Sequence, residues 1–254
     1  MIQQERFRKI LELLHDQEII KVSYLMELFG VSIETVRRDL EALEKKKELV
    51  RVYGGAVLPP KKAAEPAFQI RQGRNASAKR RIGTLAADLV QDGDVIAIDH
   101  GTTTYELAKA LVGKKKITVI TASISIAAIL AEDPEIKVII IGGVVRGGDL
   151  SLSGSLAERN LSEFCTDKFF MGVGGLTEEN GVTDFHMEEA SVRRIALQNT
   201  QKVIALVDHS KFGVTVMNRI CDLKQVNTLV TDAETDPDLV QLLKDTGVEV
   251  HIAE

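Results

Sequence analysis

The sequence predicts an α/β protein made of two domains: a small helical domain that ends in a β-hairpin, and a larger domain with a mainly parallel sheet. Three observations lead to this fold class. Apolar residues recur at helical spacing in the first 45 positions, and Val- and Ile-rich runs alternate with helical segments after residue 90. A cluster of prolines separates the two patterns.

The proline cluster sets the domain boundary. Pro59, Pro60 and Pro66 are three of the five prolines in the 254-residue chain. Because proline fixes φ and has no amide hydrogen to donate to a helix or sheet, the cluster predicts an extended connector. We therefore expect domains over residues 1–57 and 76–254, joined by a linker over 58–75.

Composition excludes several classes of protein. The chain is 44% hydrophobic and 27% charged, as in soluble globular proteins. Its longest apolar run, Val138–Val145, is far shorter than the ~20 residues of a membrane span, and the N-terminus lacks the pattern of a secretory signal. Cys165 and Cys221, the only cysteines, have no partner at metal-ligand spacing. We expect a cytoplasmic protein without a metal, a cofactor or a membrane partner.

Charge is distributed unevenly along the chain. Residues 1–62 hold 12 basic and 10 acidic side chains, whereas the remainder holds 20 basic and 27 acidic ones. A slightly basic first domain on an acidic second domain is compatible with DNA binding by the first, but the excess is too small to establish it.

Two apolar faces at three- and four-residue spacing predict the first two helices. The first comprises Phe7, Ile10, Leu11 and Leu14, and the second comprises Val22, Leu25, Leu28 and Phe29, before Gly30.

A third helix is expected to begin at Ser32 as its N-cap, because the Ser32 hydroxyl can accept from an unpaired amide of the first turn. Its apolar positions Val36, Leu40 and Leu43 should be buried, which exposes Arg37 and Arg38 with Glu34, Glu41 and Lys45. A short helix, a glycine turn and a helix with two arginines match a helix-turn-helix, whose second helix enters the major groove. A solvated charged face on an ordinary three-helix bundle is the alternative.

The segment from Leu49 to Val57 is typical of a β-hairpin, with Gly54 and Gly55 permitting a tight turn. A hairpin after a recognition helix forms a wing, and Arg51 is placed to contact a phosphate. The candidate DNA-binding residues are Ser32, Glu34, Thr35, Arg37, Arg38 and Arg51.

The second domain alternates predicted strands and helices, so its sheet should be mainly parallel and covered on both faces. The expected strands are Val95–Asp99, Ile117–Thr121, Ile136–Ile141, Lys168–Val173, Val203–Val207, Thr228–Thr231 and Val248–Ile252. The expected helices include Tyr105–Val112, Ile124–Ala131, Leu156–Phe164, Glu188–Gln201 and Pro237–Thr246.

Small-residue loops follow several of these strands. Ligands of open α/β sheets bind at the carboxyl ends of the strands, and a Gly/Thr loop before a helix attracts a phosphate through amides, hydroxyls and the helix N-terminus. Each such loop can equally be a turn or a helix cap. The candidates are Asp99, Gly101, Thr102, Thr103 and Thr104, then Thr121 and Ser123, and Gly142 with Gly143.

Two polar segments add charge to this set. Asp208 and Lys211 follow one strand, so Lys211 can face an anion at that strand's end. Asp184 and Glu188 precede a helix, where their carboxylates can accept from sugar hydroxyls. A surface lysine and acidic residues favoured at a helix N-terminus are the alternatives.

The segments Val31-Ser32, Thr35–Leu40 and Arg51–Ala56 resemble the head signature of the DeoR-type regulators of bacterial sugar metabolism. The resemblance continues through residues 99–103, Gly142-Gly143, Gly181 with Thr183, and residues 208–213. It implies DNA binding by a winged helix-turn-helix and a sensor domain with the fold of ribose-5-phosphate isomerase and CoA transferases. It also implies a sugar-phosphate effector whose pocket includes Asp99, Gly101, Thr102, Thr103, Asp208 and Lys211.

The sequence departs from the family pattern at three places. His100 replaces a small residue in the Gly/Thr loop, Ala122 replaces an asparagine, and Lys47-Glu48 replaces a glycine turn before the wing. The first two concern the pocket, so the identity of the effector cannot be transferred from a relative.

Two other classes of protein are alternatives to a regulator. A sugar-phosphate isomerase needs a positioned base and acid, and Asp99, Asp184, Asp208 and Lys211 nominally supply such groups, but no nucleophile–base pair is recognisable from spacing. A purely structural protein leaves the recognition helix unexplained. We therefore expect a repressor of a sugar-metabolism operon that acts as a homo-oligomer, a dimer or tetramer, on double-stranded operator DNA.

Overall fold

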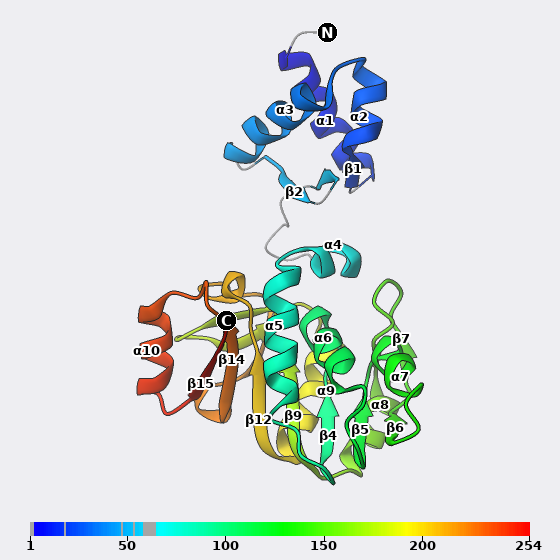
Figure 1. Cartoon of the computed structure of the whole chain (residues 1–254), viewed down its shortest axis with the longest axis vertical. Coiled ribbons are helices and arrows are strands. Elements are labelled where there is room, and N and C mark those ends of the chain that lie inside the picture. Colours follow the sequence, from blue (N-terminus) through cyan, green and yellow to red (C-terminus); the bar gives the residue numbers. More distant parts are fainter. Residues whose placement is uncertain (1–2, 18, 47, 53, 58–64) are drawn as a thin grey trace. The chain divides into compact units, whose positions relative to one another are not determined.

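The computed structural model describes residues 3–17, 19–46, 48–52, 54–57 and 65–254 (Figure 1). The chain divides into two compact units, Met1–Pro66 and Ala67–Glu254, called here the head and the body. No helix within the described ranges is both long and apolar enough to span a bilayer.

In its described part, the head combines three helices with a three-stranded antiparallel sheet of order β1-β3-β2. The elements are α1 (Gln3–Gln17), β1 (Ile19–Lys21), α2 (Val22–Phe29), α3 (Ile33–Lys45), β2 (Val50–Val52) and β3 (Gly55–Val57). The expected winged helix-turn-helix is confirmed, and β1 adds to the wing a strand that the sequence did not predict. The expected departure at Lys47-Glu48 involves residue 47, which lies outside the described residues.

The head's core contains most of the apolar positions that the helical spacing predicted, together with Ile20, Leu49 and Ala56. Leu28, expected on the apolar face of α2, is 45% exposed. Ile10 and Leu14 of α1, Leu25 of α2, and Leu40 and Leu43 of α3 are all at most 1% exposed. Burying a side chain of this size contributes about 1.5–3 kcal/mol. These residues therefore fix which face of α3 points away from the core.

The body is built on a seven-stranded parallel sheet of order β15-β14-β12-β9-β4-β5-β6. The strands are β4 (Val95–Ile98), β5 (Ile117–Thr121), β6 (Ile136–Ile140), β9 (Thr166–Gly172), β12 (Thr200–Leu206), β14 (Thr228–Asp232) and β15 (Glu249–Ala253). Because all seven run in the same direction, their carboxyl ends meet at one edge of the sheet, called here the carboxyl edge.

Helices cover both faces of this sheet, as expected for strands that are apolar on both sides (Figure 1). One face packs against α5 (Ala76–Ala87), α6 (Thr102–Leu111) and α7 (Ile124–Leu130), and the other against α8 (Ser155–Ser162), α9 (Met187–Gln198) and α10 (Pro237–Asp245). Neighbouring residues of β4 show the division, because Ile96 and Ile98 join the first core while Ala97 joins the second.

The segment expected to be a linker contains the body's first helix. Helix α4 (Phe68–Gly73) falls within the expected range 58–75, and Phe68 packs edge-on against Tyr105 of α6. Helix α5 follows directly and runs in the same direction as α6. Two contacts show this direction. Gly83 in the middle of α5 lies against Glu106 and Leu107 in the middle of α6. Lys114, which follows α6, donates to the carbonyl of Val90, which follows α5. Both helices therefore begin at the carboxyl edge.

Two small antiparallel sheets extend this edge. One has the order β10-β11-β13 (Gly175–Thr177, Gly181–Asp184, Asn218–Cys221), and the other pairs β7 (Val144–Val145) with β8 (Leu152–Ser153). A Cβ at Gly175 would overlap the carbonyl oxygen of Val214, so this glycine is needed for close packing of the backbone.

Candidate functional site

Helix α3 presents its two arginines to solvent. The Ser32 hydroxyl caps the helix by accepting from the amide of Thr35 at 3.3 Å, as the sequence predicted. Arg37 and Arg38 are exposed on the face opposite Val36 and Leu40. The nearest carboxylate to Arg37 is that of Glu34 at 3.8 Å, an exposed pair that contributes little to stability. The two guanidinium groups can therefore contact a ligand at small cost.

A buried ion pair orients α3 within the head. Asp39 is 1% exposed and accepts from Arg6 of α1, with 2.6 Å between Oδ2 and Nε. Hydrogen bonding to Asp39 raises the pKa of Arg6 although desolvation opposes it. Sequence reasoning missed this pair, because an aspartate beside two exposed arginines is expected to be exposed as well.

The wing is attached to α3 through Arg51. Its amide and its Nε donate to the carboxylate of Glu44 at 2.9 Å and 2.7 Å. Arg51 is exposed, so it can still reach a phosphate, but its charge is partly neutralised by Glu44. The contact fixes the position of the hairpin relative to the helix.

In the body, Asp99 lies at the carboxyl end of β4 and is 4% exposed. Its Oδ2 accepts from the amide of Gly172 at 2.9 Å and from Nε of Arg193 at 2.6 Å. Burial tends to raise the pKa of Asp99, but the charges and hydrogen bonds of Arg193 and His100 together outweigh it and lower that pKa. Asp99 is thus an ionised carboxylate that joins β4, β9 and α9.

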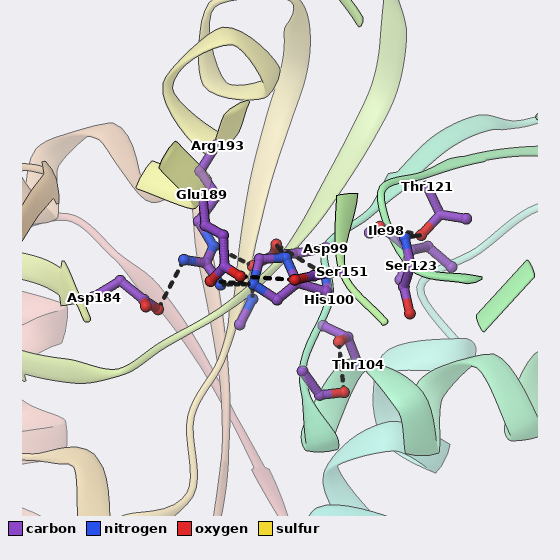
Figure 2. A network of polar contacts seen from close by, with 12 residues as sticks. Ile98, Asp99, His100, Thr104, Thr121, Ser123, Ser151, Asp184, Glu189 and Arg193 are labelled. Carbon is purple, nitrogen blue, oxygen red and sulfur yellow. Dashed lines mark hydrogen bonds and ion pairs between the residues drawn. The ribbon is translucent and has the colours of Figure 1, made fainter. Parts of the chain in front are cut away.

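His100 connects Asp99 to a second carboxylate. Its Nδ1 lies 3.1 Å from Oδ1 of Asp99, and its Nε2 lies 2.8 Å from Oε2 of Glu189 (Figure 2). Burial and the neighbouring Arg193 lower the pKa of His100, but the two carboxylates outweigh them and raise it to about 9. We therefore assign the imidazolium form, in which both ring nitrogens donate to carboxylates and Nε2 also lies 3.1 Å from Nη2 of Arg193.

The loop between β7 and β8 supplies the next layer of this network. Ser151 Oγ lies 2.7 Å from Glu189 Oε1 and 2.9 Å from Asp149 Oδ1. Arg146 ion-pairs with both carboxylates, with 2.7 Å between its Nε and Glu189 Oε1. Asp184, one of the predicted residues, lies 2.8 Å from Nη1 of Arg193. The carboxylates of Asp99, Asp149, Asp184 and Glu189 are thus all buried and paired with cations.

Several predicted hydroxyls and glycines support the backbone of the carboxyl edge. Thr104 donates to the carbonyl of Gly101 at 3.1 Å, and Thr121 donates to that of Ile98 at 2.8 Å (Figure 2). Ser123 caps α7 by accepting from the amide of Ile126. Gly142 and Gly143 have φ of 71° and 117°, and a Cβ on Gly143 would lie 2.5 Å from the carbonyl oxygen of Ser153. Glu188 is exposed, whereas Thr102 and Thr103 are buried in the first turn of α6.

A cluster of basic side chains surrounds Asp208 at the end of β12. Asp208 accepts from Asn75 at 2.8 Å, which places the start of α5 beside this strand end. Lys79, in the first turn of α5, is 4% exposed and donates to the carbonyl of Arg71. Its pKa is lowered to about 8, chiefly by burial and further by Lys211, Arg71 and Arg74, with Asp208 opposing.

Arg74 completes the basic cluster. Its Nε and Nη2 are buried and have no hydrogen-bond partner within the described residues. Buried guanidinium nitrogens normally have partners, which makes Arg74 a candidate to receive an anion. Sequence reasoning missed Arg74 and Lys79 because both fall in or beside the expected linker.

Two groups of side chains in the described residues have metal-ligand spacing: His100 with Asp149 and Glu189, and His209 with Asp232 and Glu234. In the first group, Arg146 and His100 already neutralise the carboxylates. In the second, Asp232 accepts from the amide and Nδ1 of His209 and from the amide of Glu234. Both groups are accounted for as ion-pair and turn structures.

The charge of His100 predicts a pH dependence of stability. Because its pKa is raised from about 6.5 to about 9 on folding, its contribution is fully present below pH 6.5 and is lost as the pH rises through 9. The free energy of unfolding of the wild type minus that of His100→Gln should fall by about 3 kcal/mol between pH 6 and pH 9.5. Chemical denaturation followed by circular dichroism measures it. A pH-independent difference would show that His100 is neutral in the folded protein.

An exposed arginine-bearing helix on a winged head, together with an α/β body that carries a buried polar network at its carboxyl edge, is the arrangement of a two-domain DNA-binding protein. Residues 6–62 match the family model of the DeoR-like helix-turn-helix domain, and residues 74–233 match that of the DeoR C-terminal sensor domain. The chain therefore belongs to the DeoR family of transcriptional regulators, as the sequence motifs indicated, and is not an enzyme.

Curated relatives match along nearly the whole chain. The HTH-type transcriptional regulator GolR of Listeria innocua is 36% identical over 250 residues, 98% of each chain. The HTH-type transcriptional repressor GlcR of Bacillus subtilis is 35% identical, covering 100% of this chain and 98% of the relative. The glycerol-3-phosphate regulon repressor of Escherichia coli is 29% identical, covering 99% and 100%.

Among solved structures, the ribose 5-phosphate isomerase of Methanocaldococcus jannaschii is similar over 54% of this chain and 55% of its own, with a TM-score of 0.42 and 20% identity. The full-length sorbitol operon regulator SorC of Klebsiella pneumoniae covers 96% and 99%, with a TM-score of 0.44 and 11% identity.

Proposed function

We propose that this protein is a repressor of a sugar-metabolism operon and that a phosphorylated sugar bound at the carboxyl edge controls its affinity for operator DNA. The observation that carries the proposal is the basic cluster of Arg74, Lys79 and Lys211, in which Lys79 is buried and two buried guanidinium nitrogens of Arg74 have no partner in the described residues.

Helix geometry supports a phosphate at this place. Helices α5 and α6 run in the same direction, so the first turn of α5, with Lys79, lies beside the first turn of α6, with Thr102 and Thr103. The N-terminal ends of two helices both favour an anion. Lys211 follows β12, and Asp208 and Asn75 join that strand end to the start of α5. The Gly101–Thr104 loop and Lys211 are thus the residues that we propose to hold the phosphate.

The names of two relatives support the ligand class. The glycerol-3-phosphate regulon repressor of Escherichia coli is named for a phosphorylated compound, and the relative GlcR is likewise named a repressor. At the same carboxyl edge, the carboxylate oxygens of Asp99, Asp184 and Glu189, which pair with Arg193 and His100, are candidates to accept from sugar hydroxyls. We further propose that the protein acts as a homodimer or homotetramer, because helix-turn-helix proteins commonly read two half-sites.

Thermal-shift and NMR measurements on the full chain with aldose and ketose phosphates test the proposal. We expect at least one compound to raise the melting temperature, since a ligand that prefers the folded state stabilises it, and none to be interconverted. Sustained isomerisation that is lost in Asp208→Asn would contradict a sensing role. A melting temperature that no sugar phosphate changes would contradict the assigned ligand.

A further inference from the structure

The carboxyl edge contains two regions of opposite electrostatic character. The basic region comprises Arg74, Lys79 and Lys211, with Asp208 as the carboxylate that acts on Lys79. The balanced region comprises the four carboxylates Asp99, Asp149, Asp184 and Glu189 and the four cations His100, Arg71, Arg146 and Arg193. The two regions adjoin, because Lys79 donates to the backbone carbonyl of Arg71, whose side chain lies 3.7 Å from Asp149.

The basic region is built to receive an anion. Two nitrogens of Arg74 are buried and lack a partner in the described residues, and the ammonium of Lys79 is buried against a backbone carbonyl. Burial of the cationic form is unfavourable, as the lowered pKa of Lys79 records. A phosphate at this place would supply both groups with the acceptor oxygens that they lack.

The balanced region differs because the charges of its cations are already paired. Nη1 of Arg193 is also buried without a hydrogen bond in the described residues, but it lies 2.8 Å from the carboxylate of Asp184. Each of its cations already contacts at least one buried carboxylate: Arg193 contacts Asp99 and Asp184, and Arg146 contacts Asp149 and Glu189. A second anion would either displace one of these carboxylates or lie beside it without a counter-cation. Either outcome is unfavourable, because the displaced or added charge stays desolvated.

From this division we infer that the effector carries one anionic group, its phosphate, and that the rest of the molecule is uncharged. Asp149 and Glu189 are then the residues that select against a second phosphate or a carboxylate. This inference rests on the proposed sugar-phosphate sensing.

Isothermal titration of the full chain with three matched pairs tests it. Each pair adds one anion to a neutral-bodied monophosphate: glucose 6-phosphate with 6-phosphogluconate, fructose 6-phosphate with fructose 1,6-bisphosphate, and glycerol 3-phosphate with 3-phosphoglycerate. In every pair where the first compound binds, we expect the second to bind at least about tenfold more weakly.

A charge-removing variant locates the selection. Glu189→Gln leaves Arg146 and His100 without one carboxylate, so the ratio of the two dissociation constants should fall several-fold toward one. Glu132→Gln, the same change at an exposed position beyond α7, should leave the ratio unchanged. If Glu189→Gln does not fold, the wild-type ratios decide alone.

The outcomes separate this inference from the proposal on which it rests. Equal or tighter binding of the doubly charged partner overturns the single-anion inference and leaves sugar-phosphate sensing intact. Absence of binding by all six compounds overturns sensing of a phosphorylated sugar, and the inference with it.

Discussion

Replacing Arg37 and Arg38 together with alanine is expected to lower the affinity for operator DNA by roughly a hundredfold or more. Both side chains are exposed on a capped helix whose opposite face is fixed by buried Val36 and Leu40. A bidentate contact between arginine and guanine is worth about 1–3 kcal/mol, so losing two such contacts removes most of the specific binding. Fluorescence anisotropy with labelled operator at fixed salt measures the change.

Random DNA distinguishes the two roles of these arginines. A residue that reads a base should lose affinity for the operator alone, whereas a residue that contacts phosphate should weaken binding to all sequences alike. Arg159→Ala, which removes an exposed arginine from α8 of the body, serves as the matched control and should bind as the wild type does. Wild-type operator affinity in both single variants, Arg37→Ala and Arg38→Ala, would contradict the assignment of α3 as the recognition helix.

The second large effect is expected in the body. Lys211→Ala should weaken binding of the sugar phosphate by roughly ten- to a hundredfold, because a charge-assisted hydrogen bond to a buried phosphate contributes about 1.5–3 kcal/mol. Thr102→Val, which removes a hydroxyl from the first turn of α6, should weaken binding less. Isothermal titration with the tightest compound of the panel measures both.

A lysine on β12, the strand that precedes Lys211, provides the control for this experiment. Lys202 is exposed near the amino end of β12, whereas Lys211 follows its carboxyl end, so Lys202→Ala should bind the effector as the wild type does. Operator binding without effector should be nearly unchanged in all three variants, because these residues lie outside the head. Wild-type effector affinity in both Lys211→Ala and Thr102→Val would place the phosphate elsewhere.

Local signals made most of the fold predictable. Ser32 as a cap, Gly30 as the end of α2 and the apolar spacing of α3 each act within one or two turns of helix. The strands of the parallel sheet are apolar on both faces, so their runs of Val and Ile were visible. Strand β1 was missed because Ile19–Lys21 is too short to show alternation and pairs with a segment far along the chain.

The candidate site was only partly predictable. The strand-end residues Asp99 and Asp208 were found because the end of a parallel strand is a known place for ligands. Lys79 and Arg74 were missed because a lysine or arginine in an alanine-rich segment after prolines is normally exposed. The network around Asp99 was missed because its partner Arg193 lies 94 positions away. One signal was available: Glu189 and Arg193 are four residues apart, which places them on one face of α9.

The effect of the effector on a preformed operator complex tests the central claim most directly. The full chain is bound to labelled operator, and the tightest sugar phosphate is added to saturation at constant salt. Coupling between the two domains predicts a several-fold change in operator affinity, which corresponds to a coupling free energy of about 1–3 kcal/mol. Lys211→Ala should need roughly ten- to a hundredfold more effector for the same response. An operator affinity that saturating effector leaves unchanged in the wild type would contradict control of DNA binding by this pocket.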